Sequence, residues 1–365
     1  MRKHASSSWV AGRPLILGIV SAGVVSLALQ PLAIRYSRRH GLLDVPNHRS
    51  SHSVPTARSG GVVVLGAILL GTSIILTDGT SDAQRPLLLV VVAGVFAFAL
   101  LGLYDDMHGI SPLRRLGDQF VIAGCWAAAL LLQHVDARVG NATAVYVVGA
   151  VIVVAYVNAF NFMDGVNGIA ALNAAVSAAT LAFLLNHQDE TAPAALAAVV
   201  AAAALGFLPW NAPRARIFLG DVGSYGVGAS IAVLAVVAVA SGADPLLCAA
   251  PLFVYGLDTG VTLLRRAVRR DPLTVAHRDH VYQRLVDAGS GHLGAALSCA
   301  TASGLVCGWA VLMVASGWSG WTMVPVAICV GVAYIALPNL LAVMSARSRA
   351  VDNDDGAARP FGHPG

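Results

Sequence analysis

The stretch PLLLVVVAGVFAFALLGLYDD, residues 86–106, decides the fold class of this chain. It runs from Pro86 to Leu103 without a charged residue and then reaches a tyrosine and two aspartates, Asp105 and Asp106. A helix needs about 20 predominantly apolar residues to cross the hydrocarbon core of a bilayer. We therefore expect a membrane-spanning helix at 86–103 that ends at a membrane boundary beside a pair of acidic side chains.

The whole chain has the composition of an integral membrane protein. Of its 365 residues, 57% are hydrophobic and 12% are charged, whereas soluble domains carry about a quarter charged residues. So few polar side chains could not cover the surface of a soluble protein of this size. This excludes a soluble enzyme, a disordered protein and a disulfide-stapled secreted domain. The net charge of +4 gives no reason to expect a nucleic-acid partner.

Other apolar segments resemble 86–103, so we predict an all-α polytopic integral membrane protein with about 11 transmembrane helices. The predicted spans are 14–34, 61–77, 86–103, 118–134, 142–159, 168–185, 193–209, 223–240, 245–264, 294–315 and 321–344. Residues 1–345 are expected to form a single transmembrane catalytic domain. The small and acidic residues of 346–365 predict a disordered cytoplasmic tail.

The distribution of positive charge predicts the orientation in the membrane. Eighteen of the 23 Lys and Arg residues fall in the odd-numbered loops and the C-terminal tail. Cytoplasmic loops are the ones enriched in Lys and Arg. We therefore expect a multi-pass protein of the cell (inner or plasma) membrane, with its N-terminus outside and its C-terminus in the cytoplasm. All the unusual polar motifs then lie on the cytoplasmic face.

Four aspartates, Asp105, Asp106, Asp164 and Asp221, are predicted at cytoplasmic helix ends. Any one of them alone is explained about equally well as a helix cap at the membrane boundary. Together, in segments rich in Gly and Asn, they favour a divalent cation, because Mg²⁺ takes oxygen ligands from one or two carboxylates and from substrate phosphates. We therefore expect a Mg²⁺ site, with Mn²⁺ as an alternative.

A basic group complements these carboxylates. His277, Arg278 and His280, together with Arg115, offer donors suited to phosphate oxygens. The spacing of the two histidines also fits half of a zinc site, but no third ligand of the usual type lies nearby, which favours phosphate. Asp258, inside the predicted span 245–264, is either a functional acid or one half of a structural ion pair.

In order and spacing these motifs resemble the polyprenyl-phosphate N-acetylhexosamine-1-phosphate transferases of glycosyltransferase family 4, which are relatives of the phospho-MurNAc-pentapeptide translocase. The resemblance spans Asp44 to Arg284, and the segments Asp44-Val-Pro-Asn-His-Arg-Ser-Ser-His52 and His277-Arg-Asp-His-Val-Tyr-Gln283 look most like the branch that initiates surface polysaccharides. The histidine triplet of the translocase is absent, which argues against a muramyl-pentapeptide substrate.

The resemblance implies roles for the matching positions. It makes Asp105 and Asp106 the catalytic acidic pair near the lipid phosphate, Asp221 the magnesium ligand, and Phe218 the aromatic residue that packs on uracil. The residues expected to bind substrate are Asp44, His52, Arg58, Arg115, Asn158, Asn161, Asp164, Asn167, Phe218, His277, Arg278 and His280. Asn167 stands where the family usually has a second aspartate, and Ala57 and Ser59 depart from the usual residues around Arg58.

These features together predict a Mg²⁺-dependent enzyme. It would transfer N-acetylhexosamine 1-phosphate from a UDP-sugar to polyprenyl phosphate and release UMP, the first membrane step of cell-envelope polysaccharide synthesis. The expected partners are UDP-N-acetylhexosamine, polyprenyl phosphate and the membrane, and a homodimer is left open. Two other readings stay open: a secondary transporter, whose polar site would lie near the bilayer midplane, and a catalytically impaired homologue that acts as a membrane scaffold.

Overall fold

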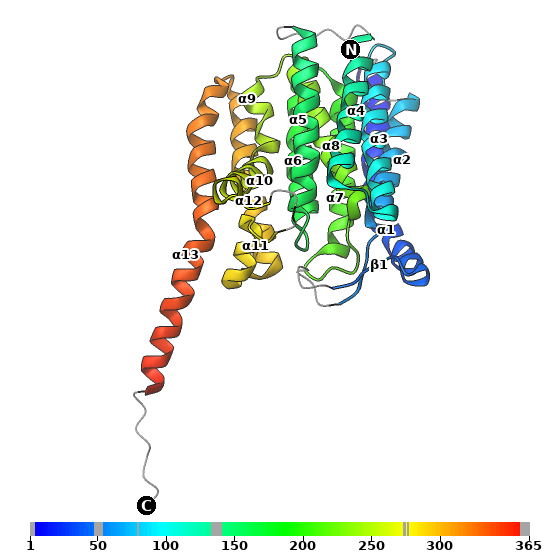
Figure 1. Ribbon diagram of the computed structural model, residues 1–365. Helices are drawn as coiled ribbons and strands as arrows, with labels where there is room; N and C mark the ends of the chain where they lie inside the picture. The colour runs from blue at the N-terminus through cyan, green and yellow to red at the C-terminus, as the bar shows by residue number, and fades with distance from the viewer. Residues whose placement is uncertain are drawn as a thin grey trace, which may run out of the picture.

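The computed structural model of the protein describes residues 4–46, 54–78, 80–132, 141–272, 275 and 277–357. It is an elongated bundle of helices with the two ends of the chain at opposite ends of the bundle (Figure 1). The long helices are α1 (His4–His40), α2 (Gly60–Asp78), α3 (Arg85–His108), α4 (Pro112–Leu132), α5 (Ala142–Met163), α6 (Ile169–His187), α7 (Thr191–Asn211), α8 (Gly220–Ala240), α10 (Ala250–Arg269), α12 (Gly291–Ser316) and α13 (Met323–Ala357).

Ten of the described helical segments are long and apolar enough to cross a membrane. This confirms an all-helical, multi-pass membrane protein, and each of the ten segments corresponds to one of the 11 predicted spans. The segment that fails is 245–264. There the chain forms a short helix, α9 (Pro245–Cys248), and then α10.

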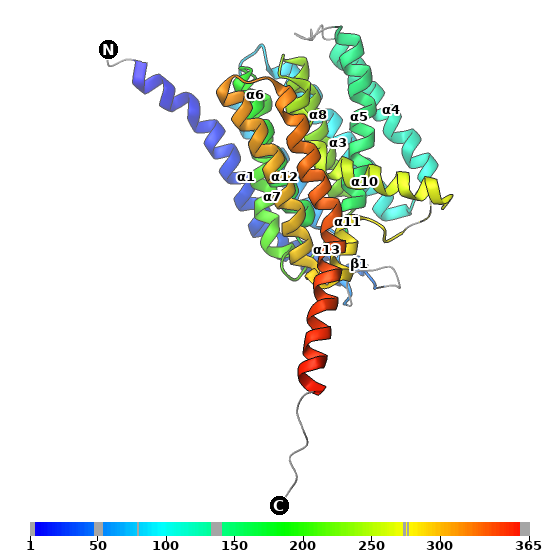
Figure 2. The same cartoon turned by 90° about the vertical axis from the view of Figure 1, so that its left-hand side faces the viewer.

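Two properties of its sequence explain why this segment does not form one straight span. Pro251 lies in the first turn of α10, where it lacks the N–H that would join the two helices into one. The rest of α10 then buries a polar face that includes Asp258, Thr259 and Arg266, which a helix surrounded by lipid could not do. In Figure 2, α10 runs across the long axis of the bundle rather than along it.

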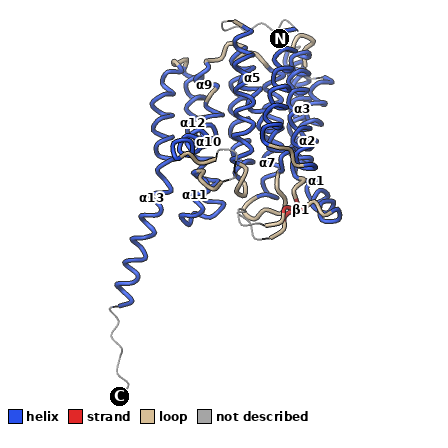
Figure 3. Tube along the Cα trace, viewed as in Figure 1, coloured by secondary structure: helices blue, strands red, loops and turns tan. Residues whose placement is uncertain are grey.

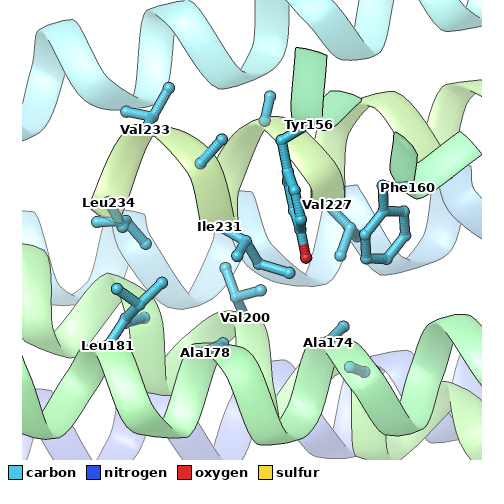
Figure 4. Close-up of a cluster of buried hydrophobic side chains, with 14 of the residues drawn as sticks. Tyr156, Phe160, Ala174, Ala178, Leu181, Val200, Val227, Ile231, Val233 and Leu234 are labelled. Atoms are coloured by element: carbon cyan, nitrogen blue, oxygen red, sulfur yellow. The ribbon is translucent and has the colours of Figure 1, made fainter. Parts of the chain in front are cut away.

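Helix α8 is the centre of the bundle. In its most apolar stretch 94% of the residues are buried, whereas in that of the segment Gly320–Met344, which includes the first part of α13, only 17% are. Val227 and Ile231 of α8 lie beside Tyr156 and Phe160 of α5 (Figure 4). The small side chains of Ala174 and Ala178 of α6 belong to the same cluster. The sequence of α8 is apolar on all sides, which is the pattern of a helix enclosed by protein.

Glycines bring the helices around α8 unusually close at one end of it. A side chain at Gly102 of α3 would collide with the backbone carbonyl of Asp221, and one at Gly61 of α2 would collide with the backbone of Gly223. Small residues at such crossings let helices pack backbone to backbone in membranes. As a result the beginning of α2 and the last turns of α3 lie directly against the start of α8.

The remaining elements are short and lie mostly at that same end of the bundle. Strands β1 (Leu43–Asp44) and β2 (Thr56–Ala57) form an antiparallel pair, which is the only sheet in the described part of the chain (Figure 3). Helix α11 (Val281–Leu285) runs into a π-helical turn (Val286–Ser290) before α12, and a 3₁₀ turn (Gly320–Thr322) precedes α13. Helix α13 continues through Ala357, into the segment 346–365 for which a disordered tail is expected from the sequence.

Candidate active site

The polar side chains gather where several elements end or begin. Helix α3 ends at His108, α5 ends at Met163, α8 begins at Gly220, and α2 begins directly after β2. In Figure 1 this is the lower end of the bundle, near β1 and α11 and away from the N-terminus. Segments far apart in the sequence therefore contribute to one site.

Backbone hydrogen bonds fix the segment around Arg58 against the start of α8. The Phe218 N–H donates to the carbonyl of Ala57 at 2.7 Å, and the N–H groups of Gly60 and Gly61 donate to the carbonyls of Phe218 and Leu219 at 3.0 and 2.8 Å. Three bonds on both sides of Arg58 leave its Cα little freedom to move. The Arg58 side chain therefore starts from a defined point beside α8.

Arg58 bridges two of the predicted aspartates. Its Nη2 lies 2.9 Å from Oδ1 of Asp106 and 3.2 Å from Oδ2 of Asp221. Burial by itself lowers the pKa of the guanidinium, but the carboxylates of Asp221, Asp106 and Asp44 more than offset this and raise it. One positive charge thus holds together carboxylates from α3 and α8.

Asp106 also caps helix α8. Its two carboxylate oxygens accept hydrogen bonds from the backbone N–H groups of Asp221 at 3.1 Å and Val222 at 2.9 Å. These N–H groups have no partner within the helix, and a carboxylate there also interacts favourably with the helix dipole. Gly220 allows the approach because it has φ of 73° and a side chain on it would press on Arg58 and Asp106.

Asp221 is oriented from its other side by α5. Nδ2 of Asn161 donates to Oδ1 of Asp221 at 3.0 Å and to the hydroxyl of Ser224 at 2.9 Å. The Asp221 carboxylate is therefore held between the Asn161 amide and the Arg58 guanidinium. The structure brings Arg58, Asp106, Asn161 and Asp221, all predicted from the sequence, into one cluster.

Asp164 completes the acidic group from the loop after α5. The pKa of Asp164 is raised to about 8, chiefly by withdrawal from water and then by the negative charge of Asp221, while Arg58 partly offsets these effects. A carboxyl group with this pKa holds its proton at neutral pH in the absence of a ligand.

These side chains line a polar cavity of about 420 Å³, within the size range of small-molecule sites. Its lining residues are Asp44, Arg58, Asn161, Asp164, Gly165, Val166, Asn167, Asn211, Phe218, Gly220, Asp221, Gln283 and His292. Seven of the residues expected to bind substrate or metal are among them. The cavity lining includes the ionic side chains of Asp44, Arg58 and Asp221 and the aromatic ring of Phe218.

Asp106 does not line this cavity but pairs with Arg58, which does, whereas Asp105 faces other partners. The Asp105 carboxylate is buried and accepts hydrogen bonds from the hydroxyl of Tyr225 at 2.9 Å, the backbone N–H of Ile110 at 2.9 Å and Arg115 at 3.4 Å. Arg115, expected to bind substrate, thus pairs with Asp105 on another side of α3. The structure separates the two aspartates that the resemblance treats as one catalytic pair.

Asn158 and Asn167 have protein partners of their own. The amide of Asn158 donates to Gln119 of α4 and to the carbonyl of Val154, one turn back on α5. Asn167 lines the cavity, and its amide donates to the carbonyl of Pro213 at 3.1 Å. His52 lies outside the described residues.

His277, Arg278 and His280 do not line the cavity. His280 is buried, and its Nδ1 lies 3.0 Å from the Asp258 carboxylate, while Arg278 pairs with Asp287 at 3.2 Å. The pKa of His277 is lowered by burial and then by the nearby His280 and Arg266. Two of the three residues predicted to bind substrate phosphate, Arg278 and His280, are therefore held by protein partners outside the cavity lining.

Sequence reasoning missed three cavity residues: Asn211, Gln283 and His292. Asn211 is buried at the end of α7 and joins two loops, accepting from the N–H of Gly168 at 2.6 Å and donating to the carbonyl of Ile217 at 3.0 Å. Gln283 stands inside the His277–Gln283 motif and could have been found from it. His292 follows the π-helical turn, and nothing in its local sequence marks it.

An apolar groove of about 890 Å³ lies on the other side of Arg58. Arg58 lines both this groove and the polar cavity, and Asp106 lines the groove. The groove's other lining residues are Leu29, Leu32, Ala33, Tyr36, His40, Gly41, Leu42, Leu43, Ser59, Val62, Val63, Leu103, Met107 and Val222. The site therefore joins a polar compartment to an apolar one.

The carboxylates of Asp106 and Asp221 fit a divalent cation. Both lie within 3.2 Å of one guanidinium nitrogen, so they are close enough to share a single positive charge. In the described part of the chain no group of three or more His, Cys, Asp or Glu is arranged to hold a metal. The protein would thus supply part of a coordination shell, as is usual where phosphates provide the remaining ligands of Mg²⁺.

Comparison of the sequence with known proteins shows the family to which this chain belongs. The sequence profile described as glycosyl transferase family 4 matches residues 88–239. A decaprenyl-phosphate N-acetylglucosaminephosphotransferase of Mycolicibacterium smegmatis is 31% identical over 80% of this chain and 81% of its own length. A probable undecaprenyl-phosphate N-acetylglucosaminyl 1-phosphate transferase of Bacillus subtilis is 27% identical over 76% of this chain and 80% of its own.

A more distant similarity is to a phospho-N-acetylmuramoyl-pentapeptide-transferase of a Mycobacterium species, 30% identical over 61% of this chain and 76% of its own length. The polar residues at the ends of α3 and α5 and at the start of α8 lie within residues 88–239, which the family profile matches. The chain therefore belongs to glycosyl transferase family 4, as a relative of the polyprenyl-phosphate N-acetylglucosamine-1-phosphate transferases and a more distant one of the muramoyl-pentapeptide transferases.

Proposed function

We propose that this protein transfers N-acetylhexosamine 1-phosphate from a UDP-sugar to polyprenyl phosphate and releases UMP. The observation that carries the proposal is the position of the Arg58–Asp106–Asp221 cluster between a polar cavity and an apolar groove. A reaction between a water-soluble donor and a lipid acceptor needs such a junction. The relatives named above point to the same donor and acceptor classes.

The polar cavity suits the nucleotide sugar. Phe218 offers a ring for the base to stack on, and Asn161, Asn167 and Asn211 offer amide groups. Arg58 can hold phosphate oxygens with its guanidinium. Asp221 and Asp106 would hold the Mg²⁺, or alternatively Mn²⁺, which when bound would neutralise charge on the diphosphate.

The apolar groove suits the isoprenoid chain of the acceptor. It is formed by α1, α2 and α3 and ends at Arg58 and Asp106, so a chain lying in it would place its phosphate beside the cluster. An oxygen of that phosphate attacks the phosphorus that bears the sugar, the bond from this phosphorus to the bridging oxygen breaks, and UMP leaves with the electron pair. Arg58 would stabilise the charge that spreads over the transferring group, which is usually the main catalytic effect in phosphoryl transfer.

The excess of Lys and Arg in the odd-numbered loops supports an orientation with this end of the bundle in the cytoplasm. Soluble nucleotide sugars are made there, so we place the reaction on the cytoplasmic face of the cell membrane. The product would be the first lipid-linked intermediate of a cell-envelope polysaccharide.

The test is UMP release by the purified protein in detergent. A panel of UDP-N-acetylhexosamines is offered with polyprenyl phosphate and Mg²⁺, and Asp221→Asn is the matched inactive variant. We expect release with at least one donor, dependent on both the lipid and the metal. Donor binding without release would favour an impaired scaffold, and flux of a donor across vesicles without release would favour a transporter.

A further inference from the structure

Arg58 occupies the position where a bound cation would be shared. A single nitrogen of its guanidinium is within 3.2 Å of carboxylate oxygens of both Asp106 and Asp221. Two carboxylates this close repel each other unless a positive charge lies between them. In this structure that charge comes from Arg58.

The two carboxylates are fixed, whichever cation they bind. Asp106 is held by the backbone N–H groups of Asp221 and Val222. Asp221 is held by the amide of Asn161. These contacts do not involve Arg58, so they would remain if its side chain moved away.

The Arg58 side chain, in contrast, is the most exposed of the three. It is 41% exposed, against 12% for Asp106 and 21% for Asp221. Its backbone is anchored on both sides, so the guanidinium would swing about a fixed Cα. Because Arg58 lines both the cavity and the groove, its guanidinium could reach phosphate oxygens bound in either compartment.

We propose that Arg58 is the internal counter-ion of Asp106 and Asp221 and exchanges with the divalent cation when a diphosphate binds. The metal and the guanidinium exclude one another between Asp106 and Asp221. The diphosphate gives Arg58 a new anionic partner, which frees both carboxylates for the metal. Metal and diphosphate binding are then coupled, and each raises the affinity for the other. This inference rests on the proposed function, because it assigns the diphosphate of the donor as the group that draws Arg58 away.

The first test measures Mn²⁺ binding to the purified full chain without nucleotide, from the electron paramagnetic resonance signal of free Mn²⁺. Removing the guanidinium with Arg58→Gln should tighten Mn²⁺ binding about tenfold, equivalent to about 1.4 kcal/mol. Arg115→Gln is the matched control, because Arg115 pairs with the neighbouring Asp105 outside the cavity. This substitution should change the Mn²⁺ affinity by no more than about twofold, because salt screens the effect of a charge that lies farther from the metal. Asp221→Asn should lose the binding in either background.

The second test adds UDP as the diphosphate probe. UDP should raise the Mn²⁺ affinity of the unmodified protein more than that of Arg58→Gln, because only the former has a guanidinium to displace. Arg58→Lys, which keeps the charge but loses the planar fork, should bind Mn²⁺ with an affinity between the two. This conservative variant gives a result even if Arg58→Gln does not fold.

Unchanged or weaker Mn²⁺ binding by both Arg58 variants would overturn the inference, as would an equal gain from Arg115→Gln. An equal effect of UDP on the unmodified protein and on Arg58→Gln would overturn it too. These results would leave the proposed function intact if the unmodified protein still releases UMP with Mg²⁺. Absence of UMP release with every donor, together with absence of Mn²⁺ binding, would instead contradict the proposed function itself.

Discussion

Asp105 and Asp106 differ in what they contact, although they are neighbours in the sequence. Successive residues on a helix point about 100° apart. Asp106 therefore faces Arg58 and the start of α8, while Asp105 faces Tyr225 and Arg115. We predict that Asp106→Asn lowers kcat about a hundredfold or more, as for loss of one preorganised charge in an active site. Asp105→Asn should cost less in kcat and more in thermal stability, because it disrupts a buried hydrogen-bonded group.

UMP release and thermal unfolding of both variants check this prediction. The two substitutions are matched, since each replaces one carboxylate by an amide of the same shape on the same helix. A larger loss of kcat in Asp105→Asn, at unchanged stability, would show that Asp105 rather than Asp106 touches the reacting groups.

Asp164 predicts a pH dependence of stability. Burial raises its pKa to about 8 in the folded protein, so the folded state binds this proton more tightly than the unfolded chain, where an aspartate titrates near 4. Stability therefore falls as pH rises between these two values. Asp164→Asn carries no charge at any pH, so it should unfold at a higher temperature than the unmodified protein at pH 8.5 and at a similar temperature at pH 4.5. The shift should reach several degrees or more, since this pKa difference is equivalent to several kcal/mol and 1 kcal/mol moves Tm by roughly 2–4 °C in proteins of moderate size.

The measurement is thermal unfolding in detergent with EDTA and without nucleotide. The exposed pair of Asp118 with Arg114 provides a control, because Asp118→Asn should leave the pH profile unchanged. If Asp164→Asn were less stable at pH 8.5 than the unmodified protein, the charged carboxylate would have a stabilising partner, and the sign of the argument would be reversed.

At the scale of elements, α10, α11 and α13 are joined by one buried carboxylate. Asp258 of α10 accepts from the N–H of Val281 at the start of α11 at 3.0 Å and from the Tyr334 hydroxyl of α13 at 3.0 Å, and its Oδ1 lies 3.0 Å from Nδ1 of His280. Asp258→Ala leaves these buried donors without a partner and should cost about 3 kcal/mol or more. Thermal unfolding checks this, with Asp118→Ala as an exposed control expected to change little. An equal Tm for Asp258→Ala and the unmodified protein would mean that other contacts hold the three helices together.

The sequence predicts most of the elements and only part of the site. Ten spans follow from apolar length alone, because each residue of a lipid-exposed helix must be compatible with hydrocarbon. The failure at 245–264 has a tertiary cause: Asp258 and Arg266 are tolerated because α11, α13 and the loop before α11 supply their partners. The end of the bundle that carries the site could be predicted, since polar residues cluster after the ends of the apolar runs.

Seven of the cavity residues could be predicted, but the complete lining could not, since it depends on how the helices pack around α8. Nothing in the sequence distinguishes the faces of Asp105 and Asp106, and Asn211 looks like an ordinary end of α7. The donor chemistry of His277, Arg278 and His280 and the family resemblance predict phosphate binding, but Asp258 and Asp287 hold His280 and Arg278 outside the cavity lining.

At the scale of the whole molecule, the two compartments meet at Arg58, so each can be blocked separately. Val62 of α2 lines the apolar groove and not the polar cavity. We predict that Val62→Trp fills part of the groove and raises the KM for polyprenyl phosphate by about tenfold, an effect equivalent to about 1.4 kcal/mol. The KM for the UDP-sugar should stay within about twofold, because the polar cavity is unchanged, and a change limited to one substrate is the mark of lost binding rather than lost catalysis.

The control is Val121→Trp on α4, which changes another exposed valine away from the groove and should affect neither KM. A photoreactive polyprenyl phosphate should in addition label α1, α2 or α3, whose side chains form the groove. Labelling confined to α4, α5 or α10, with an unchanged lipid KM in Val62→Trp, would place the isoprenoid chain on the opposite side of α3. The acceptor phosphate would then approach past Asp105 and Arg115 rather than along α1, and the two aspartates at the end of α3 would exchange the roles assigned to them here.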